Sequence, residues 1–501
     1  MTSSPLAEKV PKPLKELTQS FTESVKATGI PDAIFSHEHE SEAHKMWRSH
    51  ANHSGDSSQP HPVPGIQSSQ ATGVIYITNR AQAAGFGPGV EGWANCGQGA
   101  PETGLIPGAA PKPSTLDFGE YGDDIHEYAP TAGFKPLREA IADYYNREFR
   151  QDKSMKYGPE NVCVVPGGRG GLSRIAAVLG DINLGFSVPV YSAYEQMLSA
   201  FSRFVPIPTQ TEAKNGYTLT AEEIRKEILG RGLSAFLLSN PNNPTGRQIH
   251  GQELADLVKV GRDTECSMIL DEFYSWYQHT GELGKAVSAA RYVEDPNEDP
   301  IILIDGLTKN WRCPGWRVCW VVGPSELVSA LSAAGSFLDG GASHPMQCLA
   351  IEMLKPERVE ADRLALQRHF RMKRNHVLER LEKMGLSIAN PPDSTFYIWV
   401  DLKSLPAPLT SGMVFAEEAL KEKVIVVPGI FFDVNPSRRR NILHSPCESY
   451  SELALVPRKS CICVTCSTMT DRSPSLPLRQ SDFRLALHSK SLTWVWMASK
   501  G

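Results

Sequence analysis

The chain has 501 residues, of which 41% are hydrophobic and 21% charged, and it is long enough to bury a large core in more than one domain. Its formal net charge of −5 at pH 7 excludes a strongly basic nucleic-acid-binding protein, so we expect a small-molecule substrate and no nucleic-acid partner. No stretch approaches the roughly 18 apolar residues of a membrane span and no apolar signal segment opens the chain, so we expect a cytoplasmic protein without a membrane partner.

Ten cysteines are scattered along the chain. The closest group, Cys461, Cys463 and Cys466, lacks the second ligand pair that a zinc-finger-like site requires. We therefore expect reduced thiols and no metal.

The two ends of the chain differ in composition from its middle. Residues 1–70 are rich in Ser, His, Glu and Pro, with one helical pattern near 14–26, and predict a partly disordered N-terminal arm. Residues 71–125 are expected to form the N-terminal part of a small domain. Residues 451–501 form an atypical tail, because the stretch after residue 455 is rich in Cys, Ser, Thr and Pro and shows no helical or strand period.

The middle of the chain alternates short β-type runs with helical patterns. This alternation predicts a large α/β domain over residues 126–355, with crossover helices and a parallel or mixed sheet. The buried strands expected in this domain are residues 161–165, 235–239, 268–270, 301–304 and 318–322.

The pattern changes after residue 355, where a C-terminal small α+β domain is expected over 356–450. It begins with a long charged helix at 357–384. Two strands, at 396–402 and 424–427, then surround a helix near 413–423.

The first predicted strand, 161–165, leads into a glycine-rich turn at 166–171 and then into an apolar helical stripe. Backbone N–H groups of such a turn, together with the helix N-terminus, can surround a phosphate. A merely tight strand-to-helix turn explains the glycines equally well. A dinucleotide-binding fingerprint is disfavoured, because Gly168-x-Gly170 is followed by Ser173 where a glycine is needed.

A second turn, at residues 239–246, has the sequence Ser-Asn-Pro-Asn-Asn-Pro-Thr-Gly and follows the next predicted strand. Each proline fixes its own φ and biases the residue before it, so the turn can hold the Asn243 side chain for donation to a ligand oxygen. An ordinary surface turn is the alternative for one Asn-Pro pair, and two such pairs ending in Thr-Gly are rarer.

Asp271 and Tyr274 follow the strand at 268–270. Ligands of α/β sheets bind at such strand ends, where a carboxylate can pair with a ring nitrogen and a tyrosine can donate to a phenolate. The alternatives are a helix cap for Asp271 and core packing for Tyr274.

Lys309 follows the strand at 301–304, and Arg317 comes just before the strand at 318–322. A lysine at a strand end can lose solvent, which lowers its pKa and makes the amine nucleophilic toward an aldehyde. Arg317 can bind a phosphate with its planar fork. A solvated lysine and a surface ion pair are the alternatives for these two residues.

The order of these features resembles the class I/II aminotransferase family, the fold-type I group of pyridoxal-phosphate (PLP) enzymes, over residues 97–450. The resemblance implies a large α/β/α domain with a mainly parallel mixed sheet and a small α+β domain. It also implies PLP as the cofactor, an amino acid and a 2-oxo acid as substrates, and a homodimer with shared active sites.

The resemblance carries roles to individual residues. Lys309 matches the lysine that forms the Schiff base with the cofactor and then moves the proton between the substrate's α-carbon and the cofactor's C4′. Asp271 matches the carboxylate that keeps the pyridine nitrogen protonated. Asn243 and Tyr274 match the two groups that hydrogen-bond the cofactor's O3′, and Tyr191 matches the aromatic residue that stacks on the ring.

Further matches concern the phosphate and the substrate. Arg317 and the amides of Gly168 and Arg169 match the groups that hold the cofactor's phosphate. Tyr128 matches a tyrosine that reaches the phosphate of the partner subunit. Gly99 matches the glycine beside the substrate carboxylate.

Two departures from the family pattern stand out. Family members usually carry Ser three residues before the Schiff-base lysine, where this chain has Gly306, and Thr308 is the nearest hydroxyl that can replace it. The family also continues, after a segment like 445–450, into a strand with the arginine that binds the substrate's α-carboxylate, and residues 451–455 do not match that strand. Arg484 lies in a segment that resembles it but comes later in the chain.

An insertion before Arg484 is one explanation for the second departure. We prefer the hypothesis that the tail is an intron read as coding sequence, with the reading frame lost. Read two nucleotides later, the codons of residues 494–498 must encode Gly, then Leu, Val or Met, then Asp and Gly, which resembles the family's closing helix.

Three alternatives to a transaminase remain open. Residues 306–309 and 314–317 also suit a lyase of the same fold, either 1-aminocyclopropane-1-carboxylate synthase-like or carbon–sulfur-cleaving. An aberrant tail would also be compatible with an inactive product. A dinucleotide-dependent dehydrogenase is disfavoured by the glycine spacing.

Sequencing of the transcript tests the read-through hypothesis. We expect a spliced message in which the codons for much of residues 451–501 are missing. A continuous message that encodes the whole tail, as the major transcript, would contradict it.

Overall fold

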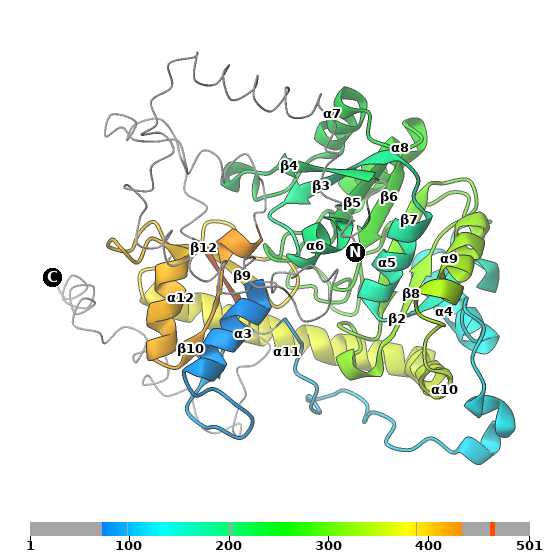
Figure 1. Ribbon diagram of the computed structural model, residues 1–501, viewed down its shortest axis with the longest axis horizontal. Coiled ribbons are helices and arrows are strands. Elements are labelled where there is room, and N and C mark those ends of the chain that lie inside the picture. The colour runs from blue at the N-terminus through cyan, green and yellow to red at the C-terminus, as the bar shows by residue number, and fades with distance from the viewer. Residues whose placement is uncertain are drawn as a thin grey trace, which may run out of the picture. The chain divides into compact units, whose positions relative to one another are not determined.

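The computed structural model describes residues 73–97, 99–199, 201, 204–386, 388–432 and 461–465 (Figure 1). The predicted N-terminal arm lies outside the described residues, and so does the tail apart from Cys461–Thr465. None of the described helices is long and apolar enough to cross a membrane.

A seven-stranded sheet forms the centre of the fold, with the strand order β2-β8-β7-β6-β5-β3-β4. Strand β8 is antiparallel to both of its neighbours, and the other neighbouring strands are parallel, which confirms the expected mainly parallel mixed sheet. The strands are β2 (Val162–Pro166), β3 (Ile182–Val188), β4 (Phe204–Gln210), β5 (Ala235–Ser239), β6 (Ser267–Asp271), β7 (Ile301–Gly306) and β8 (Val318–Val322).

All five strands predicted for this domain are present, and two further strands, β3 and β4, were missed. Strand β4 contains Pro206 and Pro208, which weaken its strand signal and which an edge strand tolerates because one side needs no hydrogen bonds. Strand β3 is interrupted by Gly185, whose missing side chain leaves room for Leu233 and Phe236.

Helices cover both faces of this sheet, as the burial of its strands requires. Every residue of β5, β7 and β8 is buried, and since successive side chains point to opposite faces, both faces must be covered. Helices α7 and α8 pack together, and so do α5 and α9. The helices of this region are α4 (Lys135–Phe149), α5 (Gly168–Val178), α6 (Ala193–Ser199), α7 (Ala221–Arg231), α8 (Gly251–Asp263), α9 (Ser325–Leu338) and α10 (His344–Met353).

The predicted charged helix is α11 (Pro356–Lys383), the long yellow helix in Figure 1. The strands after α11 form a three-stranded antiparallel sheet with the order β11-β12-β9, and β10 pairs in parallel with β1 from the N-terminal part of the described chain. These elements are α3 (Gly73–Ala83), β1 (Ala94–Asn95), β9 (Tyr397–Asp401), α12 (Gly412–Lys421), β10 (Val424–Ile425), β11 (Val427–Pro428) and β12 (Cys461–Thr465).

Segments from both ends of the described chain meet around the smaller sheets. Helix α3 packs on β10 and β11, and Arg80 forms an ion pair with Glu417 of α12 at 2.7 Å. That residues 71–125 and 356–450 form one small domain remains a prediction. It requires contacts between the two segments, and those of α3 with β10, β11 and α12 are of this kind.

Strand β12 corrects the prediction that no strand follows residue 455. It is the central strand of the three-stranded sheet and pairs with both β9 and β11. Its sequence, Cys-Ile-Cys-Val-Thr, was interpreted only as a cysteine cluster, although it is short and β-branched as strands often are. The segment around Arg484 lies outside the described residues.

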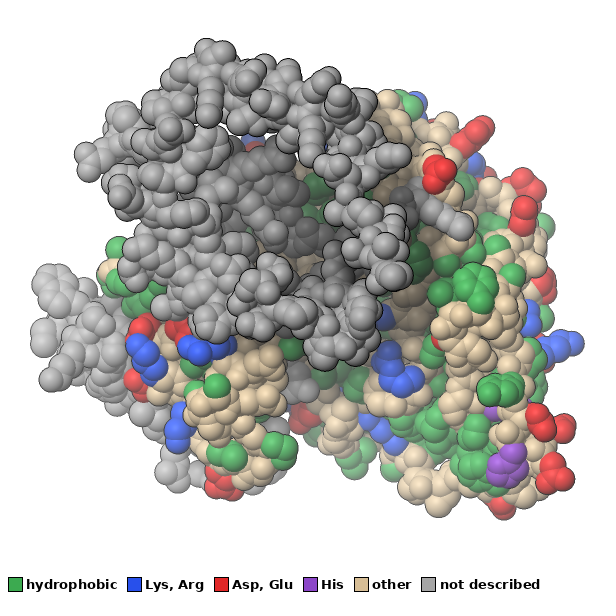
Figure 2. Space-filling view, viewed as in Figure 1, with side chains coloured by type: hydrophobic (Ala, Val, Ile, Leu, Met, Phe, Trp, Pro, Cys, Tyr) green, Lys and Arg blue, Asp and Glu red, His purple; other side chains and the backbone are tan. Residues whose placement is uncertain are grey.

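On the face seen in Figure 2, the acidic and basic side chains of the described residues are interspersed with apolar ones. Lys and Arg form no continuous patch on the described part of that face.

Glu272, which follows β6, is a carboxyl group inside the core. Its two oxygens accept hydrogen bonds from the hydroxyl of Ser288 at 2.5 Å and from the backbone N–H of Ala289 at 2.8 Å. Burial raises the pKa of Glu272 to about 8, and the neighbouring Asp271 carboxyl adds to the increase. The folded protein therefore favours the uncharged form of this side chain.

Glu272→Gln is expected to make the folded state less sensitive to a rise in pH from about 4.5 to about 8. Because the folded pKa is raised, the stability that Glu272 contributes is complete below the unfolded pKa near 4.5 and is lost as pH rises through about 8. The unfolding free energy of the wild type should fall relative to that of the variant by up to about 1.4 kcal/mol per pH unit in this window. Urea denaturation at a series of pH values measures the difference.

Glu102→Gln is the matched control, because His369 and Lys373 hydrogen-bond to Glu102 and its pKa is lowered to about 2. Its stability contribution is present above the unfolded pKa and is lost as pH falls through about 2, so this variant should be destabilised at neutral pH. A pH-independent difference between wild type and Glu272→Gln would contradict the assignment.

Candidate active site

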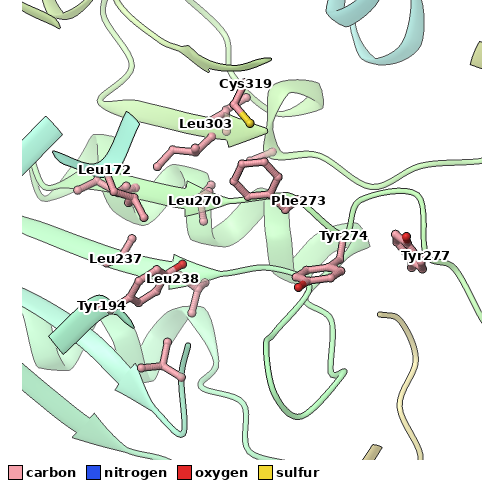
Figure 3. Close-up of a cluster of buried hydrophobic side chains, with 14 of the residues drawn as sticks. Leu172, Tyr194, Leu237, Leu238, Leu270, Phe273, Tyr274, Tyr277, Leu303 and Cys319 are labelled. Atoms are coloured by element: carbon pink, nitrogen blue, oxygen red, sulfur yellow. The ribbon is translucent and has the colours of Figure 1, made fainter. Parts of the chain in front are cut away.

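The site lies where three neighbouring parallel strands end. The register pairs Ser239 of β5 with Asp271 of β6, and Asp271 with Ile304 of β7. Asn243 and Lys309 follow β5 and β7 by a few residues, so three of the predicted site residues come from adjacent strand ends. Figure 3 shows apolar side chains of these strands, of β8 and of α5 packed together, with Tyr274 and Tyr277 beyond the end of β6.

The Lys309 side chain is largely desolvated. Its Nζ donates a hydrogen bond to the carbonyl oxygen of Gly99 and lies 5.8 Å from the ring centre of Phe396. Burial lowers the pKa of Lys309 to about 8; the Asp271 carboxylate opposes this decrease, and Arg169 and Arg317 add to it. A larger fraction of this amine than of an exposed lysine is therefore neutral and nucleophilic near neutral pH.

Asp271 is a buried carboxyl at the last position of β6. Its Oδ2 accepts a hydrogen bond from the hydroxyl of Tyr194, and its Oδ1 accepts one from the N–H of Phe273 at 3.4 Å. Burial raises the pKa of Asp271 to about 6, while the Tyr194 hydrogen bond opposes the increase. A cationic ring nitrogen beside this carboxyl would favour its charged form.

Tyr194 was not predicted from the sequence. It lies on α6, three residues after Tyr191, and the two rings make an edge contact with centres 5.6 Å apart. A tyrosine in an apolar helical stripe is normally a packing residue, so only the folded chain shows that its hydroxyl reaches Asp271.

Asn243 precedes Asp271 in the sequence and Tyr274 follows it, and both are buried. The hydroxyl of Tyr274 is 2.7 Å from that of Tyr397, a second residue that the sequence analysis missed, because β9 is distant along the chain. The Oδ1 atom of Asn243 accepts no hydrogen bond from the part of the chain that is described. A buried polar atom without a partner points to a ligand at this position.

An anion-binding arrangement lies at the start of α5. Arg169 donates to the hydroxyl of Tyr191 at 2.7 and 3.1 Å, and Arg317 donates to the carbonyl oxygens of Pro314 and Pro166 at 3.2 and 3.5 Å. Neither guanidinium has a carboxylate partner among the described residues. Two unpaired cations beside the N-terminus of a helix suit a phosphate group.

Glycine is required at the entrance to this helix. Gly167 has φ +88°, and a Cβ there would lie 1.8 Å from the guanidinium of Arg317. At Gly168 a Cβ would lie 2.5 Å from the ring of Phe273. The glycine turn therefore has a packing reason in addition to any ligand that it binds.

The first departure from the family pattern also has a packing reason. Gly306 of β7 pairs with Cys319 of β8, and a Cβ at Gly306 would lie 2.4 Å from the Cα of Cys319 and 2.6 Å from its Cβ and Sγ. A serine does not fit there without a shift of the sheet. The hydroxyl of Thr308 lies 3.1 Å from the Cys319 sulfur, so the thiol occupies the space beside the predicted replacement hydroxyl.

Two of the predicted residues are not brought to this site by the described structure. Tyr128 is 90% exposed, as expected of a side chain that reaches another molecule rather than its own strand ends. Arg484 lies outside the described residues. Gly99 is at the site, since its carbonyl oxygen accepts the hydrogen bond of Lys309 and a Cβ there would lie 3.2 Å from the hydroxyl of Tyr397.

The family model described as aminotransferase class I and II matches residues 98–448. The chain belongs to this aminotransferase family. It is 28% identical over 311 residues to the aspartate/prephenate aminotransferase of Thermus thermophilus. The matched region covers 61% of this chain and 76% of that relative. It is also 27% identical over 319 residues to the LL-diaminopimelate aminotransferase of Moorella thermoacetica. This matched region covers 62% of this chain and 76% of the relative.

Solved aminotransferase structures share the fold. The aspartate aminotransferase of Thermus thermophilus with maleate superimposes with a TM-score of 0.65 at 20% identity, covering 85% of this chain and 98% of that one. An aminotransferase from Mycobacterium tuberculosis has a TM-score of 0.65 at 20% identity, covering 88% of this chain and 99% of that one. At 20% identity, these comparisons show that the chain shares the fold of these aminotransferases.

In this aminotransferase, Gly306→Ser is expected to destabilise the fold by about 1–3 kcal/mol, because overpacking forces β7 and β8 apart. Cys319→Gly removes two of the three close contacts, so the double variant should lose less stability than the sum of the single variants. Urea unfolding of the four proteins gives this coupling energy.

Gly315→Ser is the control, because a Cβ at Gly315 would meet no atom within 4 Å. Its unfolding free energy should stay close to that of the wild type. Strictly additive effects of Gly306→Ser and Cys319→Gly would show that the serine clashes with something other than the Cys319 side chain.

Proposed function

We propose that this aminotransferase binds PLP covalently on Lys309 and moves an amino group between an amino acid and a 2-oxo acid. The observation that carries the proposal is the position of the Lys309 amine, which is desolvated and within the electrostatic influence of Asp271, Arg169 and Arg317. The resemblance assigns to Lys309 both the covalent link and the later proton transfer at the substrate's α-carbon. Bound PLP would supply an electron-withdrawing ring that stabilises negative charge at that carbon.

The remaining cofactor contacts follow from the chemistry of the residues present. Asp271 would hold the proton of the ring nitrogen, and Tyr194 would orient that carboxylate through its hydrogen bond. Asn243, through its amide nitrogen, and Tyr274, through its hydroxyl, would donate to the ring oxygen. Tyr191 would stack on the ring.

The phosphate would be bound by the amides of Gly168 and Arg169 and by the guanidinium groups of Arg169 and Arg317. The exposed Tyr128 supports a homodimer in which this residue contributes to the site of the partner subunit. Gly99 would lie beside the substrate carboxylate. If the tail is an insertion, Arg484 would bind that carboxylate.

We also propose a cytoplasmic location. Six described cysteines are free and buried, as expected for a protein in a reducing compartment.

Purified protein mixed with PLP is expected to develop a visible absorbance band, and borohydride reduction should fix the cofactor to the peptide that contains Lys309. Lys309→Ala should lose both signals, because no other amine replaces the desolvated one. Lys259→Ala, on the exposed face of α8, is the matched control and should keep both.

Addition of single amino acids then separates transamination from lyase chemistry. A transaminase converts the bound cofactor to its amine form, and a 2-oxo acid restores the original spectrum. Turnover of an amino acid with no such conversion would favour the lyase, and a wild type that binds no PLP would contradict the proposed function.

A further inference from the structure

The residues that flank Lys309 are held by a buried polar network that the sequence analysis did not single out. Asp305 and Asn310 lie on either side of the segment that contains Lys309, and both are buried. The amide nitrogen of Asn310 lies 3.0 Å from each carboxyl oxygen of Asp305. The backbone N–H of Gly306 donates to the same carboxyl at 2.6 Å. These bonds close residues 305–310 into a compact loop.

Asn310 also joins this loop to the segment that follows β6. Its amide nitrogen donates to the hydroxyl of Ser275 at 2.9 Å, and its amide oxygen accepts from the backbone N–H of Trp276 at 3.1 Å. The hydroxyl of Tyr277 donates to the backbone carbonyl of Lys309 at 2.9 Å. The Asn310 side chain thus joins the loop of Lys309 to residues 275–277 through both its amide nitrogen and its amide oxygen.

These two segments carry the groups that must act together. Residues 271–277 contain Asp271 and Tyr274, and residues 305–310 contain Lys309. Segments after strand ends are usually the mobile parts of a sheet protein, and a displacement of about 1 Å at a reacting group can cost about 100-fold in rate. A network that joins the two segments fixes the position of the amine relative to the carboxylate.

We infer that Asn310, together with Asp305 and Ser275, is a positioning residue that sets the place of Lys309 relative to Asp271 and Tyr274. Asn310 does this without touching the reacting atoms. The inference rests on the proposed function, because it takes Lys309 as the residue that binds the cofactor. We call these three residues the Asn310 clamp.

Asn310→Ala tests the clamp. It removes the bonds to Asp305 and Ser275 and leaves the N–H of Trp276 without its acceptor. We expect the rate at which PLP is trapped on Lys309 by borohydride in the apo-protein to fall about 10-fold to 100-fold. PLP affinity should fall as well, and kcat should fall more than KM rises, because binding of the amino acid does not involve the clamp.

Asn146→Ala is the matched control. The Asn146 amide likewise bridges two backbone groups, the carbonyl oxygen and the N–H of Tyr157, at 2.8 and 2.9 Å. This variant should lose stability but trap PLP on Lys309 at the wild-type rate. Equal trapping rates for Asn310→Ala and Asn146→Ala would overturn the inference and leave Asn310 a structural residue.

Ser275→Ala provides a milder variant in case Asn310→Ala does not fold. It removes one connection of the clamp and should slow trapping by a smaller factor, and a wild-type trapping rate in this folded variant would also count against the clamp. The two proposals fail in different ways. Failure of the wild type to trap PLP overturns the function, whereas normal trapping by the wild type and by the clamp variants overturns only the clamp.

Discussion

The parallel pairing of β5, β6 and β7 is the constraint on which the site depends. Backbone hydrogen bonds fix the register of these strands, so the chain leaves all three at the same edge of the sheet. Asn243, Asp271 and Lys309 are far apart in the sequence and become neighbours for this reason. A change of register would separate them even if every side chain were kept.

Charge is distributed so that the site favours an anion and a neutral amine. Arg169 and Arg317 have no carboxylate partner in the described residues, and both lower the pKa of Lys309 in addition to the effect of burial. Asp271 opposes them, and its own pKa is raised by burial to about 6. A phosphate between the two arginines, with a ring nitrogen at Asp271, would compensate charges that the chain leaves unpaired.

The smaller sheet shows how the unusual tail contributes to the fold. Strand β12 lies between β9 and β11, so Cys461–Thr465 supplies the central strand from a segment that the family pattern does not explain. The same sheet carries Tyr397, whose hydroxyl meets that of Tyr274. Residues from the tail and from the large sheet are thus connected through β9.

The sequence by itself determined the local features of this aminotransferase: the five apolar strands, the glycine and Asn-Pro turns, and the order in which Asn243, Asp271 and Lys309 follow strands. These depend on the composition of short segments and on what each backbone can adopt. Only the tertiary structure decided that Tyr194 reaches Asp271, that Cys319 requires glycine at 306, and that Asn310 joins two loops. These contacts connect residues on different strands, and their geometry depends on register and packing, which no short segment encodes.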